Sequence, residues 1–157
     1  MKTLSKTIIL ICLSSTLLGQ SIPKKSIFCL DGTEYTKQEL SEGTVLFLVS
    51  SLTCGFCLNE IPFFNHIAET YSTSKNIRFV VLLDNNQKYI NEYKSLGKLF
   101  YNEHWIVSSK SMSYIKKIWI KKTFPEYHIY INGKFKKTFA YANDETRKAL
   151  TEYLKSL

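Results

Sequence analysis

The sequence predicts an α/β fold in which a mixed β-sheet lies between layers of helices, and three observations support this prediction. Residues 43–51, GTVLFLVSS, contain a continuous apolar run of β-forming residues, as in strands that are covered on both faces. An amphipathic helical segment and a second apolar run, residues 77–83, follow it and complete a βαβ unit. Near the C-terminus, Asn132-Gly133 separates two strand-like segments, and Asn-Gly is the strongest short-range hairpin signal.

The segment that precedes the first long strand is expected to be made of short pieces. Residues 26–30 alternate weakly between apolar and polar side chains, and the turn signal Asp31-Gly32-Thr33 follows them. Residues 36–40 predict one helical turn. After the strand at 43–51, a helix is expected over residues 58–71, where apolar side chains recur at helical intervals: Ile61, Phe64, Ile67, Ala68 and Tyr71.

The second half of the chain continues the alternation of strands and helices. The remaining expected elements are a strand at 77–83, a helix at 88–99, a short extended piece at 105–107, a short helix at 113–120, and hairpin strands at 127–131 and 134–141. The final helix spans 144–157, with Asn143 or Asp144 as its cap. Its apolar stripe consists of Ala149, Leu150, Tyr153, Leu154 and Leu157.

The chain is expected to contain one domain after an N-terminal targeting segment. It has 157 residues, 45% of them hydrophobic and 22% charged, which is ordinary globular composition. Residues 1–20 have the pattern of a secretory signal peptide: Lys2 and Lys6 come first, and the apolar run TIILICLSSTLLG follows. This run is too short and too soon interrupted for a membrane span, although an uncleaved anchor is the alternative. We therefore expect export, with residues 21–157 forming the domain.

The charge of the chain gives little information about partners. The net charge is +8, and about +6 remains without the two lysines of the predicted signal peptide. Lysines cluster at 116, 117, 121 and 122, and again at 134, 136 and 137. We interpret these clusters as a solvated face, with steering toward acidic partners or a membrane surface as the alternative. A nucleic-acid partner is not expected, because no recognisable binding motif is present and export argues against it.

The cysteines indicate redox chemistry. Export implies an oxidising compartment, and residues 21–157 contain Cys29, Cys54 and Cys57, an odd number that argues against a purely structural disulfide framework. Cys54 and Cys57 lie where the buried strand passes into the helix. Unpaired backbone N–H groups and the helix dipole favour a thiolate there, with pKa values of roughly 3.5 to 7.5 against about 8.5 for an ordinary thiol.

The spacing of Cys54, Cys57 and Glu60 at the start of the predicted helix indicates a different chemical role for each. Cys54 is expected to be the exposed nucleophile, and Cys57, one turn along, to be more buried and to attack a mixed disulfide formed at Cys54. Glu60 follows Cys57 by three residues and shares its side of the helix. It is expected either to exchange a proton with Cys57 or to be an exposed helix glutamate. Pro62 falls inside the helix.

With strand, CxxC pair, helix and proline in this order, the sequence resembles the thioredoxin superfamily. Pro62 stands five residues after Cys57, which is the family's interval, and Phe124-Pro125 before YHIYINGKF matches the family's cis-proline. The motif CGFCLNEIP, the DGT turn before the first core strand and the insertion at about 77–99 are similar to the TlpA/ResA-like branch. The resemblance extends from about residue 26 to the C-terminus.

This resemblance implies a thioredoxin-like three-layer sandwich and an exported thiol–disulfide oxidoreductase. Cys54, Cys57 and Glu60 would be catalytic, and Phe124 and Pro125 would dock an extended client segment by β-strand addition. The branch mostly reduces protein disulfides with electrons from a redox donor that is often membrane-bound, and it needs no cofactor or metal. We expect a monomer. Disulfide donation and a non-catalytic binding module are the alternatives.

Several residues depart from the pattern or invite another interpretation. Thr53 and Phe56 stand where the branch usually has an aromatic residue and proline, and Glu126 follows Pro125 where a small residue or threonine is usual. These departures leave the redox direction and the client open. Cys29, in an apolar segment, is interpreted as a small buried hydrophobe, with a resolving thiol as the alternative. No zinc site is expected, because His66, His104 and His128 lack paired ligand spacing.

Overall fold

The computed structural model describes residues 21–97, 105–108, 112–118 and 120–157 and contains one mixed five-stranded sheet. The strand order is β5-β4-β3-β6-β7. β3 runs parallel to β4, and β4 runs parallel to β5, while β6 is antiparallel to both β3 and β7. The strands are β3 (Thr44–Ser50), β4 (Ile77–Leu83), β5 (Trp105–Ser108), β6 (Glu126–Ile131) and β7 (Lys134–Ala140).

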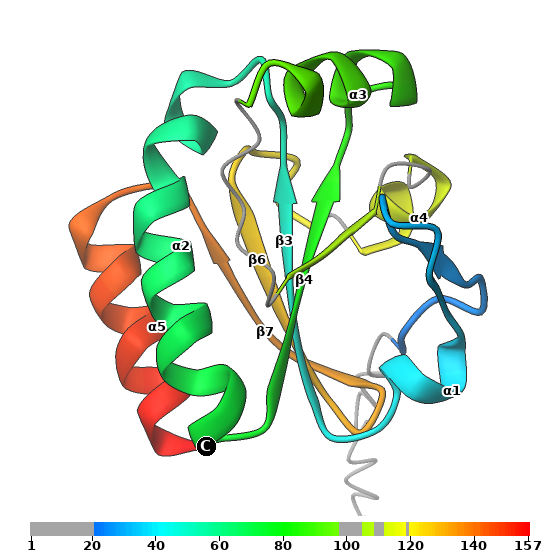
Figure 1. The fold of residues 1–157 in the computed structure, drawn as a ribbon. Helices are drawn as coiled ribbons and strands as arrows, with labels where there is room; N and C mark the ends of the chain where they lie inside the picture. The colour runs from blue at the N-terminus through cyan, green and yellow to red at the C-terminus, as the bar shows by residue number, and fades with distance from the viewer. Residues whose placement is uncertain (1–20, 98–104, 109–111, 119) are drawn as a thin grey trace, which may run out of the picture.

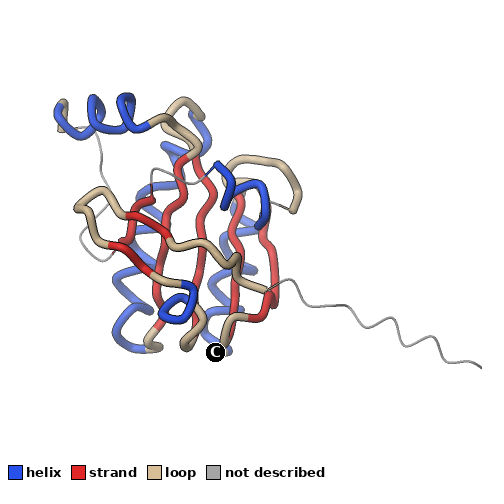
Figure 2. Tube along the Cα trace, turned by 90° about the vertical axis from the view of Figure 1, so that its right-hand side faces the viewer, coloured by secondary structure: helices blue, strands red, loops and turns tan. Residues whose placement is uncertain are grey.

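Helices cover both faces of this sheet, which confirms the predicted three-layer α/β sandwich (Figure 1). α2 (Gly55–Ser74) and α5 (Asp144–Ser156) lie together on one face. α1 (Lys37–Leu40), α4 (Met112–Ile118) and the small ribbon of β1 (Ile27–Phe28) and β2 (Glu34–Tyr35) lie on the other. α3 (Gln87–Ser95) follows β4 at the end of the sheet where α2 begins. Figure 2 shows the strands from the α1 and α4 side, in front of α2 and α5.

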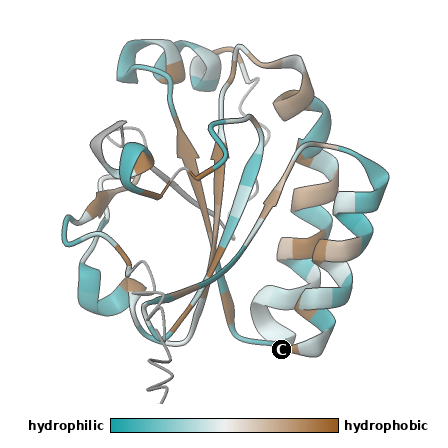
Figure 3. Cartoon of the chain, turned by 180° about the vertical axis from the view of Figure 1, so that it is seen from behind, coloured by the Kyte–Doolittle hydropathy of each residue, from teal (hydrophilic) through white to brown (hydrophobic). Residues whose placement is uncertain are grey.

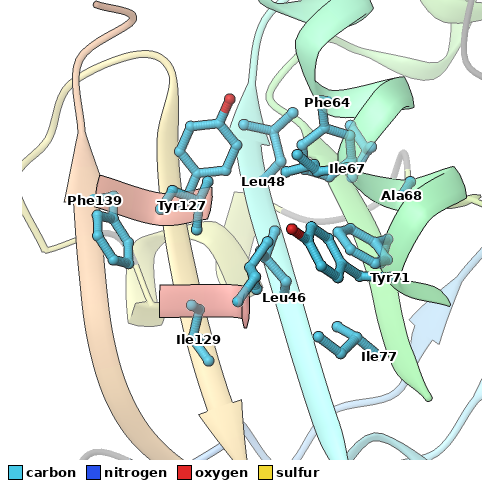
Figure 4. Close-up of a cluster of buried hydrophobic side chains, with 14 of the residues drawn as sticks. Leu46, Leu48, Phe64, Ile67, Ala68, Tyr71, Ile77, Tyr127, Ile129 and Phe139 are labelled. Carbon is cyan, nitrogen blue, oxygen red and sulfur yellow. The ribbon is translucent and has the colours of Figure 1, made fainter. Parts of the chain in front are cut away.

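Alternate residues of β3 feed two separate cores, as expected for a strand buried on both faces. Leu46 and Leu48 point into the cluster that α2 and α5 cover, whereas Phe47 joins the cluster on the α1 and α4 side. In the first cluster the rings of Phe64 and Tyr127 stack with their centroids 5.8 Å apart (Figure 4). β3 and β4 are coloured mostly hydrophobic, whereas the helices alternate between hydrophilic and hydrophobic residues along their length (Figure 3).

The observed elements differ from the predicted ones mainly at their ends. α2 begins at Gly55 rather than at residue 58, because Cys54 is the residue that precedes the first helical turn. β1 is only two residues long, because the chain turns directly after it, with the Gly32 N–H donating to the Cys29 carbonyl. α3 ends at Ser95, and Gly97 then takes a positive φ of 64°.

The predicted signal peptide, residues 1–20, lies outside the described residues and stays a prediction. Within the described part of the chain, no helix is long and apolar enough to cross a bilayer.

Candidate redox site

The candidate site lies at the end of β3, where the chain leaves the sheet and enters α2. Cys54 is the N-cap residue of α2 and has an extended backbone, with φ −99° and ψ 113°. Its side chain is half-buried, whereas the Cys57 side chain, one turn along, is only 2% exposed. Both are free thiols. The helix start therefore presents one accessible sulfur, with a second sulfur directly behind it.

Cys57 is held as a protonated thiol. Its pKa is raised to about 12, first because it is buried and second because its thiol shares a hydrogen bond with Cys54. Hydrogen bonds to the Ser51 backbone and the Ser50 side chain oppose this effect only in part. At neutral pH, Cys57 is consequently a neutral and shielded group beside the more accessible Cys54.

The loop between β3 and α2 is tied to the end of the neighbouring strand. The Leu52 N–H donates to Asn85 Oδ1 over 2.7 Å, and the Asp84 N–H donates to the Ser50 carbonyl over 3.1 Å. Ser51 Oγ and Thr53 Oγ1 lie 2.9 Å apart and hydrogen-bond each other. These bonds set the path of the backbone into Cys54. Asn85 was not among the candidate site residues, since a polar residue in a turn after a strand is common.

Glu60 is fully buried, so the alternative of an exposed helix glutamate is wrong. The Tyr127 hydroxyl donates to its Oε1 over 2.5 Å. Arg147 of α5 donates to its Oε2 from Nε over 3.0 Å and from Nη2 over 2.6 Å. The carboxylate raises the pKa of Arg147 above its usual range. Glu60 is thus the buried half of a partly buried ion pair with Arg147, and the pair together with Tyr127 joins α2, β6 and α5.

The partners of Glu60 were not identified as site residues from the sequence. From the sequence, Tyr127 is predicted only to lie in the strand at 127–131, and Arg147 only to lie in the final helix at 144–157. A carboxylate on the inward face of a helix signals that some partner is needed. Nothing in the local sequence says which residue supplies it, because 87 residues separate Glu60 from Arg147.

Phe124 and Pro125 lie at the same end of the sheet as the two cysteines, beside the C-terminal end of β3. Pro125 directly precedes β6, and the first residue of β6, Glu126, pairs with Val49 near the end of β3. The peptide bond between Phe124 and Pro125 is cis. Pro125 is buried, and Phe124 packs half-buried against the core on the α1 and α4 side.

The charge of Glu126 is accommodated inside the protein. Its side chain is fully buried, and it accepts hydrogen bonds from the N–H groups of Ile120 and Lys121 while it contacts His128 Nε2 at 3.0 Å. Burial acts to raise the pKa of this carboxyl, but the contact with His128 and the backbone hydrogen bonds outweigh it and hold the pKa below its usual value. The departure from the family pattern at this position therefore forms a built-in polar cluster.

The other residues considered as ligands or thiols lie elsewhere. Cys29 follows β1 and is half-buried, and burial together with the nearby Asp31 raises its pKa to about 12. His66 is exposed on α2, and His104 lies outside the described residues. Among the residues that the structure describes, no group of three or more His, Cys, Asp or Glu side chains is placed to hold a metal ion.

Comparison with known proteins agrees with this architecture. The family model described as Redoxin matches residues 17–145. The fold is similar to a solved structure from Chlorobium tepidum, called a thiol:disulfide interchange protein DsbE, with 16% identity, a TM-score of 0.71, and coverage of 88% of this chain and 95% of that one. A search of curated protein sequences returned no significant match.

Two further structures show the same fold. One is the pneumococcal exposed lipoprotein thioredoxin Etrx1 from Streptococcus pneumoniae, with 20% identity, a TM-score of 0.66, and coverage of 86% of this chain and 100% of that one. The other is a secreted Mycobacterium tuberculosis disulfide oxidoreductase, with 13% identity, a TM-score of 0.61, and coverage of 85% and 96%. Together with the family model, these likenesses confirm the predicted thioredoxin-like fold and the resemblance to the TlpA-type branch. The chain belongs to the Redoxin family, and its fold is thioredoxin-like.

Proposed function

We propose that the protein is an exported thiol–disulfide oxidoreductase that reduces disulfides in protein clients. The observation that carries the proposal is the pair of free thiols at the start of α2, in which Cys54 is accessible and Cys57 is buried and protonated. The pattern of residues 1–20 supports export, as do relatives described as secreted or as an exposed lipoprotein. The TlpA/ResA-like resemblance supports the reducing direction.

In the proposed reaction, the Cys54 thiolate attacks one sulfur of a client disulfide. The client S–S bond breaks, a mixed disulfide forms at Cys54, and the first client sulfur leaves as a thiolate that takes up a proton. Cys57 then loses its proton and attacks Cys54 Sγ. The intramolecular disulfide forms, and the second client thiol is released. The client gains two electrons, the Cys54–Cys57 pair is oxidised, and a redox donor protein must reduce it again.

Glu60 is proposed to take the proton that Cys57 releases. A carboxylate has about four acceptor positions, and the hydrogen bonds from Tyr127 and Arg147 use three of them. Among the hydrogen bonds of the described residues, one acceptor position on Oε1 is thus unused, and we propose that proton exchange takes place there. A Glu60→Gln variant that resolves the mixed disulfide at the wild-type rate would remove Glu60 from the mechanism.

Phe124 and Pro125 are proposed to dock the client backbone. They lie at the same end of the sheet as Cys54, next to the end of β3. The family resemblance implies that a client segment binds at this position by β-strand addition. A client segment bound there would bring its disulfide to Cys54 in an extended conformation. We propose that the protein acts as a monomer and without a cofactor or metal.

The direction of the reaction is tested by equilibrating the protein with glutathione buffers and quantifying the oxidised and reduced forms. A reductase is expected to have a reduction potential of about −270 mV, as thioredoxin has. A reduction potential of about −120 mV, as in DsbA, would instead establish disulfide donation. Failure of the pair to exchange with glutathione at all would leave only a non-catalytic binding module.

A further inference from the structure

The carboxylate of Glu126 sits in a ring of donors formed by the loop that precedes it. The Ile120 N–H donates to Oε1 over 2.8 Å, and the Lys121 N–H lies 3.0 Å from both oxygens. The Thr123 N–H completes the ring at 3.5 Å from Oε2. Neighbouring backbone N–H groups that converge in this way form an anion-binding concavity. Here the protein itself supplies the anion.

The same loop contains a backbone conformation that needs support. Lys122 is exposed and has a positive φ of 59°, in the left-handed region that residues other than glycine seldom adopt. Such conformations persist where their surroundings hold them in place. The Glu126 carboxylate bonds the N–H groups on both sides of Lys122, at Lys121 and Thr123, so it provides this support.

The carboxylate also ties the loop to the sheet. His128 Nε2 lies 3.0 Å from Glu126 Oε1, and His128 Nδ1 shares a hydrogen bond of 3.0 Å with Thr138 Oγ1 of β7. Glu126 and His128 are both completely buried, and Glu126 pairs with Val49 of β3. Residues 120–123 are therefore anchored to the strands that carry the redox site, and they lead directly into Phe124 and Pro125.

We propose that Glu126 is a positioning residue that holds residues 120–123 in the conformation that presents Phe124 and Pro125 to the client. This inference rests on the proposed function, because only the proposed function supplies a client that binds at Phe124 and Pro125. The hydrogen bonds and the ionic contact that the described residues make with the Glu126 side chain come from residues 120, 121, 123 and 128 and not from either cysteine. Loss of Glu126 should therefore weaken client binding and leave the reactivity of Cys54 unchanged.

A pair of substitutions at Lys122 tests the loop without touching the buried cluster. Lys122→Gly and Lys122→Val both remove the lysine side chain and its charge, but only glycine adopts a positive φ readily. With an insulin-type protein disulfide as the client, Lys122→Gly is expected to keep the wild-type KM within about twofold. Lys122→Val is expected to raise the KM about fivefold or more with little change in kcat, as when uniform binding is lost.

Glu126→Gln is the second variant, with the exposed Glu34→Gln as the control for loss of one negative charge. Glu126→Gln should raise the KM like Lys122→Val, and the alkylation rate of Cys54 should stay within about twofold of wild type, since a positioning role does not alter the thiol. If Glu126→Gln fails to fold, the comparison of Lys122→Gly with Lys122→Val alone tests whether the conformation of residues 120–123 controls client binding.

Equal KM values for Lys122→Val and Lys122→Gly, or an alkylation rate that falls together with client binding, would overturn the inference. A wild-type protein that reduces no disulfide is a different result. It would refute the proposed function itself, and this inference with it.

Discussion

A Cys54→Ser variant is expected to lose client disulfide reduction by about a thousandfold or more, because neither of the other two cysteines among the described residues is placed to replace the attacking sulfur. Cys57 is buried and its pKa is about 12, and Cys29, also with a pKa of about 12, follows β1 rather than capping the helix. The measurement is the rate of insulin reduction by the reduced protein. Cys29→Ser is the matched control and should keep most of the activity.

Loss of activity in both variants would show that Cys29 takes part in the reaction, contrary to the proposed mechanism. Activity that survives in Cys54→Ser would move the nucleophile elsewhere.

An Arg147→Gln variant is expected to show the largest loss of stability among single substitutions at the site. It leaves the Glu60 carboxylate fully buried without its cation, and breaking a buried pair costs about 3–5 kcal/mol. We expect a value near the lower end, about 3 kcal/mol, because the Arg147 side chain is 31% exposed and water partly screens it. For a domain of this size the melting temperature should fall by about 10 °C.

Two controls separate the buried pair from the general effect of losing a cation. Lys155→Gln breaks an exposed pair with Glu152, with both side chains more than half exposed, and should change stability by less than about 1 kcal/mol. Adding Glu60→Gln to Arg147→Gln removes the unmatched charge and should restore part of the loss. An Arg147→Gln protein that melts with the wild type would show that the pair does not stabilise the fold.

The sequence was sufficient to predict those helices, strands and turns that depend on residues close together in the chain. The apolar run that became β3, the helical spacing behind Cys57 and the Asn132-Gly133 turn each depend on residues close together in the chain, and the structure confirms all three elements. The predicted ends of the helices and strands were less accurate, because a single residue can decide where an element ends. One example is Gly97, with its positive φ, just beyond the end of α3.

The surroundings of the site could not be predicted in the same way. Glu60 was identified by its spacing from Cys57, but its partners come from β6 and α5, and only the folded chain brings these elements together. Glu126 was noticed only as an unusual charge after Pro125. Its donors depend on the left-handed backbone at Lys122, and a lysine gives no sequence signal of that conformation.

In the proposed mechanism Cys54 is the attacking thiol, and Cys57 is a shielded thiol that acts second. The most direct measurement treats the reduced wild-type protein with limiting iodoacetamide at neutral pH and maps the label to each cysteine. Cys54 is expected to be labelled at least about a hundredfold faster than Cys57, whose pKa of about 12 leaves almost no thiolate. Labelling of Cys57 as fast as Cys54 would refute this assignment of the two thiols.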